Sequence, residues 1–148
     1  MPTTEEIADE VPHTCYAVHA LMATRRLTRF YDNALRPTGL TIMQYALLCV
    51  IGYAKPESIT ALADICATER STVSRSLTPL ENAGYVTRQD ETDRRQRPIR
   101  LTKEGEAKVT EVYPAWRKAQ DALERRLGSS GEEVKSILAA LEKTVAEI

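Results

Sequence analysis

The sequence predicts a mainly α-helical protein with one small β-hairpin, and three features of the chain support this fold class. Apolar residues recur at the helical spacing of three and four positions through most of the 148 residues. Only residues 85–88 and 98–101 have the composition of short strands, and a polar loop joins them. Single glycines and prolines separate the helical stretches. This length suits one domain, or a small domain with added helices for oligomerisation.

Two helices are expected in the first third of the chain. The first spans residues 12–35, where apolar residues follow the helical period, and Pro37 closes it. The second begins after Thr41, because Gln44 stands three residues further on and completes a capping box. Gly52 and Pro56 mark the expected end of this second helix and the linker that follows it.

Residues 58–101 are expected to form two short helices followed by a β-hairpin. A helix over residues 59–66 and a turn at 67–70 lead to Ser71, a residue type that favours the N-cap of a helix. Gly84 ends this next helix, and the two strand candidates follow. A winged helix-turn-helix has this order of elements. The apolar residues expected on the inner face of its second helix are Val73, Leu77 and Leu80.

The last third of the chain predicts two more helices. Thr102 can cap a long helix over residues 103–127, and Pro114 within it should cause a kink. Ser130 and Glu133 have the spacing of a capping box at the start of the final helix. An apolar stripe then continues to the end of the chain.

A monomer of this size would leave much of its first and last helices uncovered, so these helices are the expected dimer interface. We therefore divide the chain into a helical dimerisation region, residues 1–36 and 103–148, and a winged helix-turn-helix, residues 37–102.

The net charge of −1 conceals an uneven distribution. Between Arg70 and Lys103 the chain has eight basic and four acidic residues, a net charge of +4 that leaves −5 for the remainder. Such a charged run is often only a solvated face. Here it coincides with the element best suited to nucleic acid, which favours DNA binding.

Several short motifs occur in a specific order along the chain. They are Leu40-Thr41, Gln44-Tyr45, Ser71-Thr72-Val73-Ser74-Arg75, Leu80-Glu81, Gly84-Tyr85-Val86, Asp93-Arg94-Arg95, and Ile99-Arg100-Leu101-Thr102 with Gly105. In this order and spacing the chain resembles the MarR (multiple antibiotic resistance regulator) family of winged-helix transcription regulators. The resemblance covers nearly the whole chain and places the dimer interface in the terminal helices.

The second helix of the helix-turn-helix is the expected reader of DNA sequence, because residues near its start reach base edges in the major groove. Arg75 suits a bidentate contact with guanine, typically worth about 1–3 kcal/mol of discrimination. Ser71 suits either a phosphate contact or a helix cap, and both roles stay open. The contacts expected from this helix are Ser71, Thr72, Ser74, Arg75 and Thr78.

The wing loop carries Arg94, Arg95 and Arg97, and extended arginines suit the narrow minor groove of A·T-rich DNA. The resemblance implies that Arg94 or Arg95 enters this groove while Asp93 holds the loop. Alternatively, Arg95 pairs with Asp93 or Asp90. A two-fold dimer would place its recognition helices about 34 Å apart and read an inverted repeat. Repression is the commoner output in the resemblance.

The resemblance also implies that a small molecule or an oxidant controls DNA binding. The pocket in such regulators lies between the dimer helices and the winged helix. Aromatic residues with an arginine would suit a phenolic or carboxylate ligand there, and ordinary packing of the same residues is the alternative. The candidate pocket residues are Tyr16, Arg25, Tyr31, Tyr45 and Trp116.

Cys15 is the cysteine best placed for redox sensing, because thiols near helix N-termini react more readily with peroxides. Peroxide-sensing members of the resembled family carry a reactive cysteine in a similar place, followed by an aromatic residue, as Tyr16 follows here. Counted back from Gln44, Cys15 lies about two residues too early, and His19 stands where a tyrosine is expected. Peroxide sensing is therefore the alternative to a pocket ligand.

Neither a metal nor a cofactor is expected. His13, Cys15 and His19 lie close in sequence, but a zinc site needs three or four ligands and a second shell, so a helical surface is favoured. Cys49 and Cys66 stand on apolar faces and are expected in the core.

Two rival functions remain to be weighed. The chain has no phosphate-binding glycine loop, nucleophile elbow or metalloprotease pair, so we do not expect an enzyme. A winged helix that binds another protein would be expected to lose the arginines of its wing and to expose an apolar patch. The wing here keeps its arginines.

A cytoplasmic location is expected. The first eleven residues are acidic and polar, unlike a signal peptide, and no apolar run approaches the length of a membrane span. Three widely spaced cysteines suit reduced thiols better than a disulfide framework.

Overall fold

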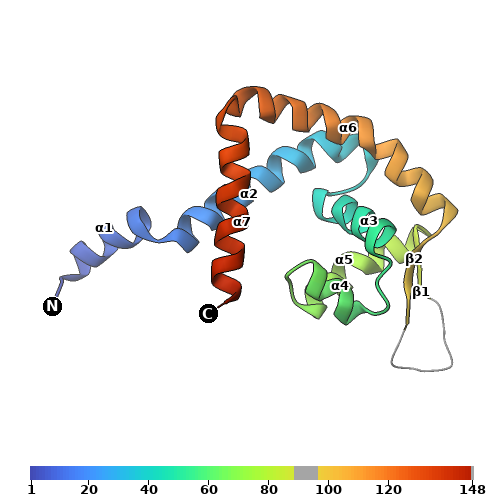
Figure 1. The fold of residues 1–148 in the computed structure, drawn as a ribbon, viewed down its shortest axis with the longest axis horizontal. Coiled ribbons are helices and arrows are strands. Elements are labelled where there is room, and N and C mark those ends of the chain that lie inside the picture. Colours follow the sequence, from blue (N-terminus) through green and yellow to red (C-terminus); the bar gives the residue numbers. More distant parts are fainter. Residues whose placement is uncertain (89–96, 148) are drawn as a thin grey trace.

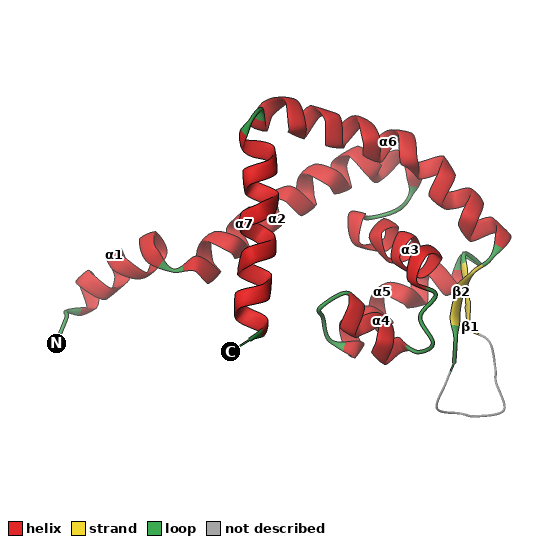
Figure 2. Cartoon of the chain, in the orientation of Figure 1, coloured by secondary structure: helices red, strands yellow, loops and turns green. Residues whose placement is uncertain are grey.

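The computed structural model describes residues 1–88 and 97–147 of the chain. The described part is helical apart from two short strands and the connecting segments (Figure 2), as the sequence predicts. Its elements are α1 (Thr4–Thr14), α2 (Tyr16–Leu35), the 3-10 helix η1 (Arg36–Thr38), α3 (Ile42–Ala54), α4 (Ile59–Ile65), α5 (Arg70–Asn82), β1 (Val86–Arg88), β2 (Ile99–Leu101), α6 (Lys103–Leu127) and α7 (Ser130–Ala146).

The molecule consists of one packed lobe and several projecting helices (Figure 1). Helices α3, α4 and α5 gather with the β1–β2 hairpin to form the lobe, which we call the winged-helix lobe. Helix α6 leaves the hairpin and runs beside α2. Helix α7 turns back from the end of α6, and α1 extends beyond the far end of α2.

The hydrophobic core lies mainly in the winged-helix lobe. It takes buried residues from α3, α4, α5 and β2, and Val112 of α6 joins them. Val73, Leu77 and Leu80 are all buried, which confirms the predicted inner face of α5. Burying these side chains supplies most of the hydrophobic stabilisation of the lobe.

Helix α3 begins as predicted and ends between the two residues expected to mark its end. The Thr41 hydroxyl accepts from the Gln44 N–H at 3.2 Å and the Gln44 side chain accepts from the Thr41 N–H at 3.0 Å, so the capping box is present. Gly52 itself stays helical, and Leu101 packs closely against it. The helix ends at Ala54, before Pro56, and its C-cap Lys55 adopts a left-handed conformation with φ of 47°.

The predicted first helix over residues 12–35 is in fact two helices. Helix α1 already begins after Thr3, whose side chain forms a capping box with Glu6. The chain leaves helical geometry at Cys15, where ψ is 113°, and α2 starts at the next residue. Pro12 therefore lies inside α1 instead of opening a longer helix.

The two C-terminal helices follow the prediction with one correction. Thr102 caps α6 by accepting from the Gly105 N–H at 3.0 Å, and Gly128 ends the helix. The capping box expected at Ser130 and Glu133 is wrong, because α7 starts at Ser130 and its N-cap, Ser129, makes no side-chain capping bond. No residue of α1 or α7 is buried within the described chain.

Among the described residues, no single helix has both the length and the apolar character needed to cross a membrane. The pair Tyr16–Thr38 and Ile42–Ala54, bent by 78°, meets that test by length and composition alone.

Candidate nucleic-acid interface

Helix α5 presents a polar outer face above its buried inner face. The helix starts at Arg70, and its N-cap is Glu69, whose side chain makes no capping bond. Ser71 is therefore not the N-cap, and that expectation is wrong: the helix starts two residues earlier than the residue preference of Ser71 indicates. Its hydroxyl lies exposed in the first turn, where a phosphate contact remains open to it.

The predicted base-reading residues differ in how freely they face solvent. Arg75 and Thr78 are exposed, whereas Thr72 and Ser74 are half-buried. The Thr78 hydroxyl donates to the Ser74 carbonyl at 2.9 Å, so part of its hydrogen-bonding capacity is used within the helix. Across the described residues, Arg75 makes no hydrogen bond or ion pair, and its guanidinium is available to a ligand.

Arg70 is a further candidate that the predicted contact set omits. It is the first residue of α5 and is exposed at the positive end of the helix dipole. Arg70 is one of the eight basic residues counted between Arg70 and Lys103. The predicted contacts omit it because an N-cap at Ser71 would place it in the preceding turn, outside the helix.

The wing is a two-stranded antiparallel hairpin in which Thr87 faces Arg100. Arg97 is exposed just before β2. The predicted minor-groove residues Arg94 and Arg95 lie outside the described residues, as do Asp90 and Asp93, with which Arg95 was expected to pair.

Among the basic residues of the segment that the structure describes, Arg88 and Arg100 bind other parts of the lobe. Arg88 forms a bidentate ion pair with Glu81, and its Nη2 lies 2.8 Å from Oε2. Arg100 reaches Glu57, with Nη2 and Oε1 2.6 Å apart. Charge counting cannot separate such internally paired arginines from those that face a ligand.

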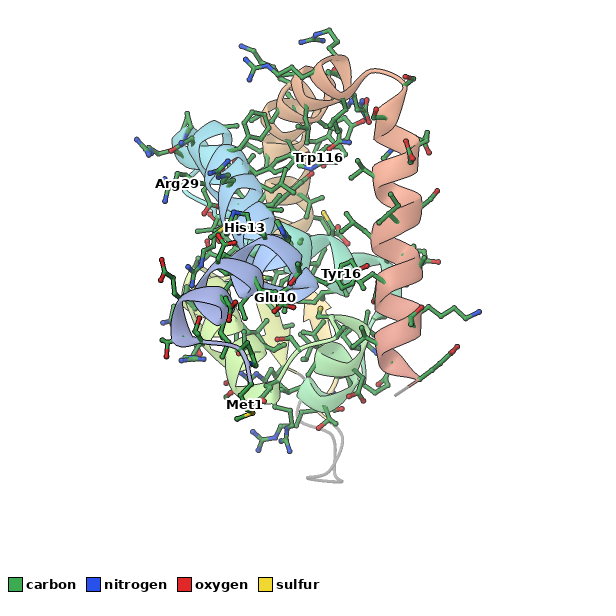
Figure 3. The ribbon with its side chains drawn as sticks, turned by 90° about the vertical axis from the view of Figure 1, so that its left-hand side faces the viewer. Met1, Glu10, His13, Tyr16, Arg29 and Trp116 are labelled. Carbon is green, nitrogen blue, oxygen red and sulfur yellow. The ribbon has the colours of Figure 1, made fainter. Side chains whose placement is uncertain are left out.

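The five predicted pocket residues do not share one pocket in the single chain. Tyr45 and Trp116 line a hollow of about 520 Å³ between α3 and α6, whereas Tyr31 lines another of about 430 Å³ between α2, α6 and α7. Tyr16 is 81% exposed and lines neither, and the exposed Arg25 lines neither. Figure 3 shows Tyr16 and Trp116 on separate helices.

The α3–α6 hollow has apolar and aromatic walls. Tyr113 joins Tyr45 and Trp116 there, and no residue with a charged side chain lines it among those described. Burial raises the pKa of Tyr45 to about 12. Cys49 opens into this hollow and is exposed, so its predicted place in the core is wrong, whereas Cys66 packs against the core. Its apolar surroundings raise the pKa of the Cys49 thiol and make it less nucleophilic.

The α2–α6–α7 hollow combines an apolar floor with polar groups at its edge. The Tyr31 hydroxyl donates to Gln120 Oε1 at 2.5 Å, and Gln120 Nε2 donates to Glu124 at 2.8 Å. Burial raises the pKa of Tyr31. Arg26, Lys135 and Glu124 also line this hollow, and Lys135 pairs with Glu132 at 2.8 Å.

Cys15 stands half-buried at the junction of α1 and α2. The two histidines near it bond to backbone: His13 Nδ1 lies 2.6 Å from the Asp9 carbonyl oxygen and His19 Nε2 lies 3.1 Å from that of His13. A search of the described residues finds no group of three or more His, Cys, Asp or Glu side chains that could hold a metal.

Helices α4 and α5 followed by the β1–β2 hairpin form a winged helix-turn-helix, a class of DNA-binding fold. A family model described as the MarR family matches residues 38–96. The chain is also 31% identical to MosR of Mycobacterium tuberculosis in a crystal structure with DNA, at a TM-score of 0.80, with 90% of this chain and 97% of that chain covered. The chain belongs to the MarR family and is a transcriptional regulator, not an enzyme.

Two further relatives agree with this assignment. An uncharacterized HTH-type transcriptional regulator of Bacillus subtilis, YwoH, is 28% identical over 109 residues, which are 73% of this chain and 80% of that protein. A Mycobacterium tuberculosis MarR family protein in complex with salicylic acid is 25% identical, with a TM-score of 0.65 and coverage of 85% of this chain and 95% of that one.

Proposed function

We propose that the protein is a homodimeric repressor that reads an inverted DNA repeat with α5 and the wing, and that a small aromatic acid releases it. The observation that carries the proposal is the outer face of α5. Arg75 projects from a helix whose other face is anchored by Leu77 and Leu80, so its guanidinium is presented on a rigid support. Such an arginine suits the O6 and N7 atoms of guanine.

The proposed homodimer accounts for α1 and α7, in which no residue is buried within the described single chain. Apolar side chains on α1 and α7 are exposed in the single chain, among them Ile7 at 45%, Ile137 at 58% and Val145 at 61%. A second copy that covers them would remove this surface from water. Two-fold symmetry would then place two α5 helices in successive major grooves, about 34 Å apart.

The binding of DNA is tested by changing Arg75 alone. Arg75→Ala is expected to lower specific affinity about 5- to 150-fold, the equivalent of about 1–3 kcal/mol, and to relax the preference for one base pair. Arg125→Ala is the matched control, because Arg125 is an exposed arginine at the end of α6 remote from the wing. Fluorescence anisotropy with labelled duplexes measures both. Equal affinities for Arg75→Ala and the parent protein would rule out Arg75 as a base reader.

Salt dependence separates this proposal from a winged helix that binds only proteins. DNA binding through several phosphate contacts should weaken steeply as salt rises, because each neutralised phosphate releases counterions. Weak binding that does not change between low and moderate salt would favour the protein-interaction alternative.

The α2–α6–α7 hollow is the better site for the proposed effector. Tyr31 lines it together with Arg26, a cation that could meet the carboxylate of an aromatic acid, although Glu124 also lines it. A related MarR family protein was crystallised with salicylic acid. Salicylate is therefore the probe: it should release DNA from the parent protein, and Arg26→Gln should need several-fold more of it. Arg25→Gln is the control, since Arg25 is exposed outside both hollows.

Peroxide sensing by Cys15 remains the second candidate, favoured by a half-buried thiol at the point where the α1–α2 backbone leaves helical geometry. A bulkier oxidised sulfur there would change the angle between the helices. An organic peroxide should then abolish DNA binding by the parent protein but not by Cys15→Ser, with Cys49→Ser as the control. Loss of binding in all three proteins, or in none, would exclude Cys15 as the sensor.

A further inference from the structure

The base of the wing is fastened to the helix-turn-helix by one arginine from each strand. Arg88 of β1 holds the carboxylate of Glu81 through two nitrogen atoms, with Nη2 and Oε2 2.8 Å apart. Arg100 of β2 donates to Glu57 Oε1 at 2.6 Å and to the carbonyl oxygens of Lys55 and Pro56 at 2.9 and 3.0 Å. We call these the Arg88–Glu81 and Arg100–Glu57 pairs.

The two acidic residues stand at the two ends of the helix-turn-helix. Glu57 immediately precedes Ser58, the N-cap of α4, and Glu81 lies in the last turn of α5. The two arginines lie on opposite strands of the hairpin. They are not directly paired: Arg88 lies opposite Ile99, and Arg100 lies opposite Thr87, the neighbour of Arg88. The wing is thus tied to both ends of the unit that carries the recognition helix.

Backbone contacts reinforce the same joint. The Ile99 N–H donates to the Pro56 carbonyl at 2.9 Å, and the Thr102 N–H donates to the Tyr85 carbonyl at 3.0 Å. Gly105 at the start of α6 lies so close to the Tyr85 carbonyl that a Cβ there would be 2.0 Å from its oxygen. The hairpin base therefore has little freedom to pivot.

Ion pairs at this degree of exposure contribute little to folding stability. The side chains of Arg88 and Glu81 are 28% and 24% exposed, and those of Arg100 and Glu57 are 27% and 57% exposed. Solvent screening limits the strength of such pairs. The bidentate Arg88–Glu81 contact nevertheless fixes relative orientation strongly, and Arg100 is held by one bond to Glu57 and by two backbone carbonyls. Orientation is therefore the property that these pairs control best.

We propose that the Arg88–Glu81 and Arg100–Glu57 pairs are positioning pairs that set the wing at a fixed angle to α5, so that wing and recognition helix enter adjacent grooves of DNA together. The proposal rests on the proposed DNA binding. In it Arg88 and Arg100 do not bind phosphates, although both belong to the basic segment. A wing held in place before binding loses less conformational entropy when it meets the minor groove.

Glu81→Gln decides between positioning and phosphate contact, because the two roles predict opposite signs. Removing an acidic group near DNA, and freeing Arg88 for a phosphate, should strengthen binding if Arg88 were a phosphate contact. The positioning role predicts binding weakened by about three- to tenfold, the cost of ordering one or two side chains and the wing at the moment of binding. Glu69→Gln is the matched control, since Glu69 is exposed beside α5 and makes no side-chain capping bond.

The DNA positions that lose protection also distinguish a positioning role of Arg88 from a phosphate contact. Hydroxyl-radical footprinting of the selected DNA site should show that Glu81→Gln and Glu57→Gln lose protection at the outer minor-groove positions while central protection persists. Arg88→Lys keeps the positive charge but cannot form the bidentate pair, so it should lose the same flanking protection. Thermal unfolding of each of these three variants checks that the lobe is folded.

Tighter or unchanged binding by Glu81→Gln, or full flanking protection by Arg88→Lys, would overturn the positioning role while leaving the DNA-binding proposal in place. Absence of any footprint from the parent protein would instead overturn the DNA-binding proposal itself.

Discussion

The winged-helix lobe buries its apolar side chains within one chain, whereas the terminal helices α1 and α7 leave theirs exposed. In the lobe, Leu48, Leu62 and Leu77 from three consecutive helices are completely buried in one hydrophobic core, which Ile99 of β2 also joins. Helices α1 and α7 have comparable apolar stripes, yet none of their residues is buried within the described chain. Figure 1 shows both helices projecting from the body.

This difference indicates which part of the fold one chain completes alone. The lobe has a closed core and can hold α5 rigidly without help. The terminal helices keep their secondary structure, but their apolar faces need a surface that the same chain does not supply. We therefore propose that the single chain presents the helix that reads DNA, and that a pair of chains sets the spacing of two such helices.

Removing a core side chain from the lobe should have the largest effect on stability. Leu77→Ala leaves a cavity in the fully buried inner face of α5 and should lower the free energy of unfolding by about 2–5 kcal/mol. Urea unfolding monitored by circular dichroism measures this change in the free energy of unfolding. Ile65→Ala is the comparison, because Ile65 is 51% exposed and should cost far less. Similar losses for both would mean that the lobe core is not closed around Leu77.

A charge on the apolar stripe of α7 should affect association and leave the fold of the lobe intact. Ile137→Asp is expected to weaken dimerisation by at least about tenfold, since it would bury an unpaired carboxylate in the interface. Sedimentation velocity over a range of concentrations measures this. Ser136→Asp adds the same charge on the other face of α7 and should leave the dimer unchanged. Dimers that tolerate Ile137→Asp would remove α7 from the interface.

The seam between the lobe and α6 should respond weakly to alkaline pH. The pKa of Tyr45 is about 12 in the folded protein against a usual 10.0. Below pH 10 both states hold the neutral phenol, so the contribution of this group is fully present. Between pH 10 and 12 the unfolded chain ionises first, and stability falls. Tyr45→Phe should lose less stability between pH 9 and 11 than the parent protein does. Equal losses would mean that Tyr45 ionises freely in the fold.

The sequence predicts the lobe well because its signals are local and redundant. The capping box at Thr41, the inner face of α5 and the cap at Thr102 are each encoded within a few residues, and all three are confirmed. The sequence-based predictions are wrong where neighbouring residues offer competing signals for the start of a helix. Serine preferences at Ser71 and Ser130 predict caps that the structure does not have.

The site was predictable only in part, because contacts between distant residues leave no periodic signal. Arg100 binds Glu57, which lies 43 positions earlier, and nothing in the spacing distinguishes it from a basic residue that faces DNA. For the same reason the sequence grouped Tyr16 and Trp116 in one pocket, whereas the structure places them on separate surfaces. The outward position of Arg75 and Thr78 on α5 is confirmed because helical period alone defines that face, whereas Thr72 and Ser74 are half-buried.

Selection of bound duplexes from a random DNA pool with the purified protein distinguishes a paired DNA reader from a single one. We expect enrichment of an inverted repeat whose half-sites are centred about one helical turn apart, 10–10.5 base pairs, because two α5 helices must enter successive major grooves. Enrichment of a single half-site would contradict the two-chain arrangement that the exposed stripes of α1 and α7 support. Recovery of no enriched sequence would contradict sequence reading by α5 itself.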